Sequence, residues 1–178
     1  MSIVSPIFPD DIGTDLSLRG FAHGTRIMTP RGWRLVEDLA VGDVLSGDQG
    51  QGVEIIATRR MMLAGPGAEA VCVGGEARGQ GRGAAPLLLT PDQMIVVAGD
   101  RLAAYFGVEE ALAPVGALVN GGDLRLIEAP MMEIWHDITL ARACTIVVEG
   151  LQVAIGGATD AARPALSAQE ARLLSLAA

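Results

Sequence analysis

Lysine is absent from this 178-residue chain, in which all thirteen basic residues are arginines. The 21 acidic residues give a formal net charge of −8, which argues against nucleic acid or an anionic membrane as a partner, because both need a basic face. Aromatic residues are also rare, at 3% of a chain that is 50% hydrophobic, so the core must consist mainly of aliphatic side chains and methionine. The length fits one domain with a substantial core.

Long apolar runs are missing as well. No run reaches the roughly 18 residues that a membrane-spanning helix needs. Residues 1–15 carry acids where a secretory signal would carry positive charge. Neither a membrane span nor Sec export is therefore expected. Localisation stays open between the cytoplasm and non-classical secretion, which includes a type I system that reads an uncleaved C-terminal signal.

Cysteine is limited to Cys72 and Cys144, whose separation matches no metal or redox spacing. We expect two buried thiols that behave as small hydrophobes. A disulfide would require the two Cβ atoms to face each other, and the sequence does not define their orientation.

Short β-favouring segments alternate with Gly-rich turns from residue 25 onward, which predicts an all-β domain. The expected strands are Thr25–Met28, Asp43–Leu45, Val53–Met62, Ala70–Val73, Ala85–Leu89, Met94–Val97, Asp123–Glu128, Met131–Leu140 and Cys144–Ile155. The expected helical segments are one turn at Val36–Leu39, a brief helix within Leu102–Leu112 and a short C-terminal helix that starts at a capping box of Ser167 and Glu170. Residues 75–83 are so rich in glycine that we expect a mobile surface loop that does not pack.

Residues 20–43, GFAHGTRIMTPRGWRLVEDLAVGD, resemble the opening of bacterial Hedgehog/intein (Hint) domains. In that family a Cys begins a pattern of the form C-F-x-x-G-T-x-I-x-T-P-x-G, and V-E-D-L-x-V-G-D follows shortly. Three later segments resemble further family motifs in the correct order, namely 89–97, 111–121 and 134–151. The resemblance covers about residues 20–155. It implies a horseshoe-like Hint β fold over 20–158, after an extended lead-in over 1–19 and before a tail with a helix over 159–178.

The chemistry of the family identifies the positions that matter. There, the Cys thiolate attacks the carbonyl of the preceding residue, a His protonates the departing amine, and a Thr positions the strained peptide. In this chain the corresponding positions are Gly20, Gln93 and Thr90. Glycine has no nucleophile and glutamine does not titrate. Inteins also end with an Asn that cyclises, but Asn120 is the only Asn here. We therefore expect a degenerate active site.

Other residues are candidates to replace the missing groups. His23 lies three residues after Gly20 and could assist as a proton donor, although an exposed loop histidine without a role is the simpler interpretation. His136 falls in a matched motif, where a buried histidine bonded to backbone is the simpler interpretation. Two histidines are too few for a zinc site, and the sequence does not obviously place an acid beside them, so neither a metal nor a cofactor is expected. Cys144 lies in a predicted buried strand, where a thiol is a poor nucleophile.

These observations predict a Hint-like domain that has lost autoprocessing and acts as a scaffold or peptide-binding module rather than as an enzyme. The bound segment would be residues 1–19 of the chain or a peptide or protein partner. The first alternative is a self-cleaving domain that acts next to Gly20 with substitute residues, such as His23 assisting attack by water. The second is a small β protein whose resemblance to Hint domains is coincidental.

Overall fold

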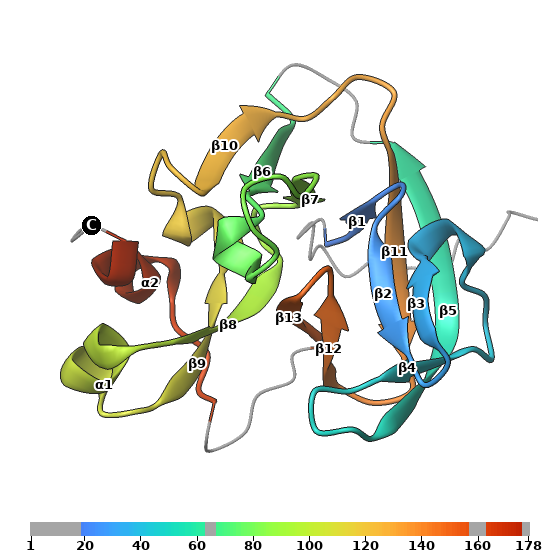
Figure 1. Cartoon of the computed structure of the whole chain (residues 1–178), viewed down its shortest axis with the longest axis horizontal. Coiled ribbons are helices and arrows are strands. Elements are labelled where there is room, and N and C mark those ends of the chain that lie inside the picture. The colour runs from blue at the N-terminus through green and yellow to red at the C-terminus, as the bar shows by residue number, and fades with distance from the viewer. Residues whose placement is uncertain (1–18, 63–66, 157–162, 176–178) are drawn as a thin grey trace, which may run out of the picture.

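The structure, a computed structural model, describes residues 19–62, 67–156 and 163–175 (Figure 1). They form two β-sheets in which neighbouring strands run antiparallel. The seven-stranded sheet contains, in spatial order, β10 (Leu124–Glu128), β6 (Glu69–Val73), β7 (Leu87–Leu89), β1 (Phe21–Ala22), β11 (Ile134–Leu140), β5 (Gly52–Met62) and β4 (Val44–Ser46). The six-stranded sheet contains β3 (Gly32–Leu35), β2 (Arg26–Thr29), β12 (Cys144–Val148), β13 (Leu151–Ile155), β8 (Met94–Ala98) and β9 (Glu110–Pro114). The expected all-β class is confirmed, and the lead-in over 1–18 lies outside the described residues.

Helical structure is sparse. Two α-helices, α1 (Asp100–Phe106) and α2 (Ala168–Ser175), lie at the end of the molecule that carries β9, away from β5 (Figure 1). Three short 3₁₀ turns complete the described elements: η1 (Val36–Asp38), η2 (Glu76–Arg78) and η3 (Val115–Leu118). No helix within the described ranges is long and apolar enough to cross a membrane.

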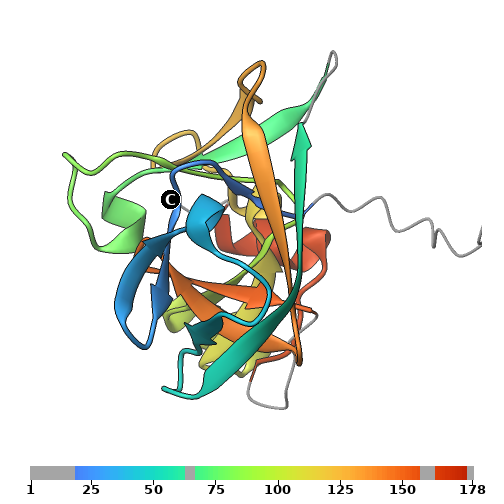
Figure 2. The same ribbon diagram turned by 90° about the vertical axis from the view of Figure 1, so that its right-hand side faces the viewer.

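The core is aliphatic, as the composition requires. Its largest cluster joins inward-facing residues of both sheets, among them Ile27, Leu45, Ile55, Leu89 and Ile146, each with 0% of its surface exposed. Burial of this apolar surface is the dominant stabilising term of the fold. The long strands β5 and β11 lie side by side and form one wall around this core (Figure 2).

The strands expected at Met131–Leu140 and Ala85–Leu89 begin later, at Ile134 and Leu87, and two further predicted segments differ from the observed elements for local reasons. The expected strand Cys144–Ile155 is divided into β12 and β13 by a tight turn at Glu149 and Gly150, whose φ angles are +48° and +86°. Positive φ at both central residues is what a two-residue hairpin with a type I′ turn requires. The expected helix within Leu102–Leu112 ends at Phe106, because Gly107 adopts a left-handed C-cap with φ of 69° and the chain then enters β9.

The C-terminal capping box is confirmed. The backbone N–H of Ser167 donates to Glu170 Oε2 at 2.8 Å, and the backbone N–H of Glu170 donates to Ser167 Oγ at 3.2 Å. The helix that follows buries Ala171 in a small cluster with Leu102 and Leu166. The cap therefore fixes the start of a helix that covers the end of the second sheet.

The two cysteines are buried and free, as expected. Burial raises the pKa of the Cys144 thiol, and the nearby charge of Arg142 only partly offsets it. A neutral buried thiol is a poor nucleophile. The burial of Cys144 thus agrees with the expectation of an unreactive thiol.

Candidate functional site

Gly20 lies directly before β1, in the middle of the seven-stranded sheet. Phe21 of β1 pairs with Leu89 of β7 on one side and with His136 of β11 on the other. The antiparallel register brings Gly20 next to Thr90 just beyond the Phe21–Leu89 pair. The first and second sequence motifs therefore meet at one point of the fold.

The turn from Thr90 to Gln93 is held in place by main-chain hydrogen bonds. The backbone N–H of Gln93 donates to the carbonyl of Thr90 at 3.0 Å, and Val115 N–H donates to the carbonyl of Gln93 at 2.9 Å. Gly116 packs against the same turn so closely that an added Cβ would lie 2.8 Å from Pro91 Cβ. Only glycine fits at such a contact. The backbone thus directs the Gln93 side chain into the interior, where 1% of its surface is exposed.

Gly20 and Gln93 line the same cavity. Its volume is about 190 Å³, whereas a second cavity, lined by His23 and Glu149 among others, measures about 410 Å³. The smaller one, which holds Gly20 and Gln93, is lined by Arg19, Gly20, Phe21, Gln93, Asp137, Ile138, Thr139, Leu140, Ala154, Ile155 and Gly156. Among these described lining residues there is neither a cysteine nor a histidine.

Several buried polar atoms beside this cavity have no hydrogen-bond partner among the described residues. Gln93 Nε2 donates to the carbonyl of Ala154 at 2.9 Å, but Gln93 Oε1 accepts nothing. Arg19 Nε, on another residue that lines the cavity, is also unpaired, as is Oγ1 of Thr90, which does not itself line the cavity. Buried polar groups are nearly always paired, so each such group calls for an explanation.

The local backbone does not force glycine at position 20. An added Cβ there would lie 3.2 Å from the carbonyl oxygen of His136 and 3.6 Å from Met61 Cε. A side chain there requires the main chain of β11 at His136 to move by a few tenths of an ångström. The lack of a nucleophile is a property of the residue type and not of the space available.

The two histidines meet on another side of β1. His23 Nδ1 lies 3.4 Å from His136 Nε2 although the residues are 113 positions apart in the chain. The Glu37 carboxylate completes the cluster, with Oε1 3.3 Å from His23 Nε2. The His23 side chain is 53% exposed and borders the 410 Å³ cavity, while His136 is buried. Sequence reasoning found no acid beside the histidines, but the fold places Glu37 there.

The protonation of this cluster follows from its surroundings. Burial lowers the pKa of His136, and the nearby His23 and Arg60 lower it further. Burial alone would raise the pKa of Glu37, but hydrogen bonds from backbone N–H groups and the two histidines outweigh it, so the pKa is lowered overall. These shifts favour the neutral form of the His136 imidazole and the ionised form of the Glu37 carboxylate.

A comparison with protein-family profiles decides the affiliation. The profile of the Hint domain matches residues 19–154. The chain belongs to the Hint domain family. The expected family and fold are thereby confirmed, and the interpretation of the resemblance as coincidence is wrong.

Solved structures agree with this fold. The Hint domain described here is similar to the solution structure of a bacterial intein-like domain from Clostridium thermocellum, with a TM-score of 0.53 and 15% identity over 78% of this chain and 99% of that chain. It is also similar to the crystal structure of the gp41-1 intein, with a TM-score of 0.51 and 13% identity over 77% of this chain and 98% of that chain. At such identities the likeness shows the fold alone. No curated protein sequence matched the chain.

A second polar network holds the Hint domain together, and sequence reasoning missed it. Arg78 lies within the segment expected to be a mobile loop, yet only 5% of its surface is exposed. Its guanidinium donates to the main-chain carbonyls of Gly74, Ala85 and Glu149. The expectation that residues 75–83 do not pack is therefore wrong, because this arginine satisfies three carbonyls from separate parts of the chain.

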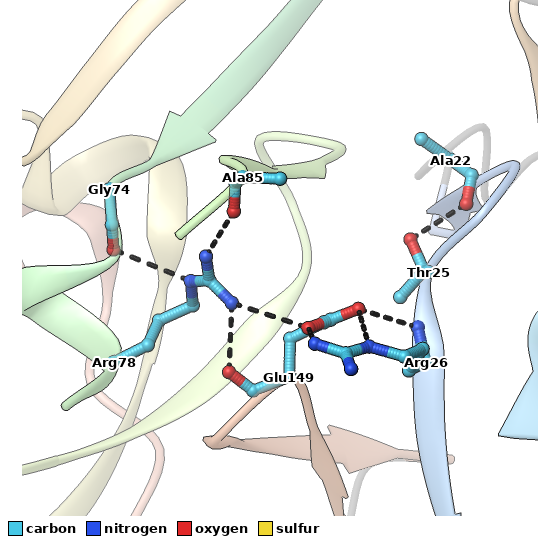
Figure 3. Close-up of polar contacts among 7 residues, drawn as sticks. All are labelled: Ala22, Thr25, Arg26, Gly74, Arg78, Ala85 and Glu149. Carbon is cyan, nitrogen blue, oxygen red and sulfur yellow. Dashed lines mark hydrogen bonds and ion pairs between the residues drawn. The ribbon is translucent and has the colours of Figure 1, made fainter. Parts of the chain in front are cut away.

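The Glu149 carboxylate links Arg78 to Arg26 on β2. It accepts hydrogen bonds from the backbone N–H, Nε and Nη2 of Arg26 at 2.9, 3.1 and 2.9 Å, and Arg78 Nη1 lies 3.6 Å away (Figure 3). Burial would raise the pKa of Glu149, but the bonds and charges of the two arginines outweigh it, so the pKa is lowered. These contacts hold Glu149 at a positive φ that a non-glycine residue rarely adopts.

Proposed function

We propose that this Hint domain has lost the acyl shift of autoprocessing and serves as a scaffold that holds a peptide segment in the cavity between Gly20 and Gln93. The observation that carries the proposal is that both positions line one 190 Å³ cavity. The space for the reaction is present, and the groups that would perform it are replaced.

Each step of the lost reaction lacks its group. The acyl shift needs a nucleophile on residue 20 to attack the carbonyl carbon of Arg19, and Gly20 offers none. Breaking the C–N bond needs a proton for the departing amine, and the Gln93 carboxamide does not titrate. The alternative in which His23 assists attack by water has weak geometric support, because His23 borders the other cavity.

The unpaired polar atoms support peptide binding. Gln93 Oε1 is an acceptor for a peptide N–H, and Thr90 Oγ1 can donate to a peptide carbonyl. Residues 1–19 of the chain are the first candidate occupant, because they are covalently continuous with Gly20 and so have a high effective concentration at the cavity. A peptide from a partner protein is the second candidate.

Intact mass spectrometry tests the loss of activity. The purified full-length protein, incubated for days with and without dithiothreitol or hydroxylamine, is expected to keep its full mass. Fragments that correspond to cleavage between Arg19 and Gly20 would establish self-processing by substitute residues and would overturn the proposal.

Limited trypsin digestion tests the binding of the chain's own N-terminal segment. Trypsin is expected to cut after Arg19 more slowly than after Arg31, which is exposed in the β2–β3 turn. Thr90→Val removes the unpaired hydroxyl with little change of shape and should speed the cut after Arg19 (control: Thr58→Val on an exposed position of β5). Equal cleavage after Arg19 in wild type and Thr90→Val would contradict occupation by this segment.

A further inference from the structure

His23, Glu37 and His136 bring three metal-ligating side chains together from separate elements. His23 lies between β1 and β2, Glu37 in η1, and His136 in β11. One ligand atom from each lies within 4.8 Å of the others. None of the three belongs to the cavity of Gly20 and Gln93.

We infer that this cluster is a binding site for a divalent transition-metal ion, with Zn²⁺ as the best match. Two imidazole nitrogens and one carboxylate oxygen form a donor set that zinc accepts, with water in the fourth position. Ligands about 2.0–2.1 Å from a tetrahedral zinc are about 3.3 Å apart. The 3.4 Å between His23 Nδ1 and His136 Nε2 matches that edge. Glu37 Oε1 lies 3.3 Å from the other ring nitrogen of His23, Nε2, so the carboxylate has to close in on the ion from within the 4.8 Å that separates the three ligand atoms.

Main-chain hydrogen bonds fix the three ligand-bearing segments relative to one another. The backbone N–H of His23 donates to the carbonyl of Ile134 at 2.9 Å, which ties the first ligand to β11. The backbone N–H of Val36 donates to the carbonyl of Thr25 at 2.8 Å, which ties η1 to the same turn. The cost of ordering the ligands is therefore met when the protein folds, and this favours binding of an ion.

Supporting contacts orient the Glu37 carboxylate. Gly24 N–H donates to Glu37 Oε2 at 2.9 Å, which leaves Oε1 directed at His23. A ligating carboxylate in proteins is normally held by such an outer hydrogen bond. The same Gly24 has φ of 84°, a conformation that suits glycine and turns its N–H toward the carboxylate.

The surroundings distinguish this cluster from a closed structural site and from a site for a hard cation. His23 is half exposed and borders the 410 Å³ cavity together with Glu133 and Glu149, so a bound ion would keep a solvent-facing position. Two nitrogen ligands disfavour Ca²⁺ and Mg²⁺, which prefer oxygen. The ion would link β11, η1 and the β1–β2 turn, and its binding free energy would add to the stability of the fold.

The test uses tag-free, full-length protein freed of metal with a chelator. We expect Zn²⁺ to bind with a stoichiometry of one by isothermal titration calorimetry. At a Zn²⁺ concentration about 100-fold above Kd, the melting temperature should rise by about 5–10 °C. Co²⁺ should give the visible absorption bands of a four-coordinate ion, which shows ligation independently of stability. Excess Mg²⁺ should produce none of these changes.

Two ligand variants and one matched control locate the site. His23→Ala changes an exposed side chain, and Glu37→Gln keeps an acceptor for Gly24 N–H, so both are expected to fold. Each should raise the Kd for Zn²⁺ by at least about 10–100-fold, which is the effect of losing only a hydrogen bond that supports a ligand. Asp38→Asn alters the exposed neighbouring carboxylate and should leave Kd unchanged. Absence of binding to wild type, or an unchanged Kd in both ligand variants, would overturn the inference.

Discussion

Arg78 binds Glu149 twice: Nη1 donates to the main-chain carbonyl of Glu149 at 2.9 Å and lies 3.6 Å from its carboxylate. A single buried guanidinium thus secures both the backbone and the side chain of a residue at the β12–β13 turn. On the other side of the carboxylate lies Arg26, so the glutamate connects the segment of η2 with β2 (Figure 3).

Replacement of Arg78 should be strongly destabilising. Arg78→Met removes a buried cation and leaves three main-chain carbonyls and one carboxylate short of a donor. Such a loss costs roughly 3 kcal/mol of unfolding free energy. Urea denaturation would measure the change. Arg82→Met in the same loop is the matched control, because the Arg82 side chain is 88% exposed and should not affect the midpoint. Equal midpoints for both variants would show that the network contributes little.

Acidification should reduce stability in two stages. Because the pKa of His136 is lowered from 6.5 in the folded protein, the unfolded chain binds the proton more readily, and stability decreases once the pH falls below about 6.5. Glu149 and Glu37 have pKa values lowered from the ordinary 4.5. Their stabilising contributions are therefore fully present above pH 4.5 and are lost as the pH falls through their folded-state pKa values.

Each titrating group can contribute at most about 1.4 kcal/mol of unfolding free energy per pH unit to this decrease. Urea denaturation at pH 7.5, 6.5, 5.5, 4.5 and 3.5 in the presence of a chelator would record both stages, the second between the last two values. His136→Gln should remove the first stage and leave the second. Equal unfolding free energies at pH 7.5 and 5.5 would contradict the assignment to His136.

Restoring both missing groups should restore cleavage chemistry. In a Gly20→Cys, Gln93→His double variant, the introduced thiolate can attack the carbonyl carbon of Arg19. The introduced imidazolium can then protonate the departing amine as the C–N bond breaks, which leaves a thioester. Hydroxylamine would trap the thioester and release residues 1–19, as intact mass would show.

Neither single variant should cleave detectably, since each lacks one of the two groups. The tight approach of position 20 to the carbonyl of His136 makes a circular dichroism comparison with wild type a necessary control. A double variant that folds normally and stays intact would mean that the cavity has lost more than these two groups.

The cap of α2 should have a measurable and local effect. Ser167→Ala removes the acceptor of Glu170 N–H and should cost about 1 kcal/mol, or roughly 2–4 °C in melting temperature. Amide hydrogen exchange should become faster in α2 than in wild type and change little in β9. Ser175→Ala at the other end of the helix is the control and should change exchange little. Uniform acceleration across both elements would show that the helix and the sheet unfold together.

The sequence motifs predict the family and most strands, since these depend on local residue patterns, whereas the expectation that Gly20 and Gln93 share a site comes from the resemblance to Hint domains. They do not predict β1, because a two-residue strand has no periodicity and exists only through its two neighbours. The burial of Arg78 could not be predicted either, because its partners are main-chain carbonyls that only the tertiary fold brings together. Glu37 reaches the histidines because η1 folds back onto the β1–β2 turn, and that contact is tertiary.

The shortness of β1 has a mechanical consequence. This strand alone connects the β10–β6–β7 half of the seven-stranded sheet with the β11–β5–β4 half. Tension carried by the backbone through Arg19 would therefore load the centre of the sheet and not its margin. A pull at α2, by contrast, would act on the periphery. Resistance of the domain to stretching should depend on which end bears the force.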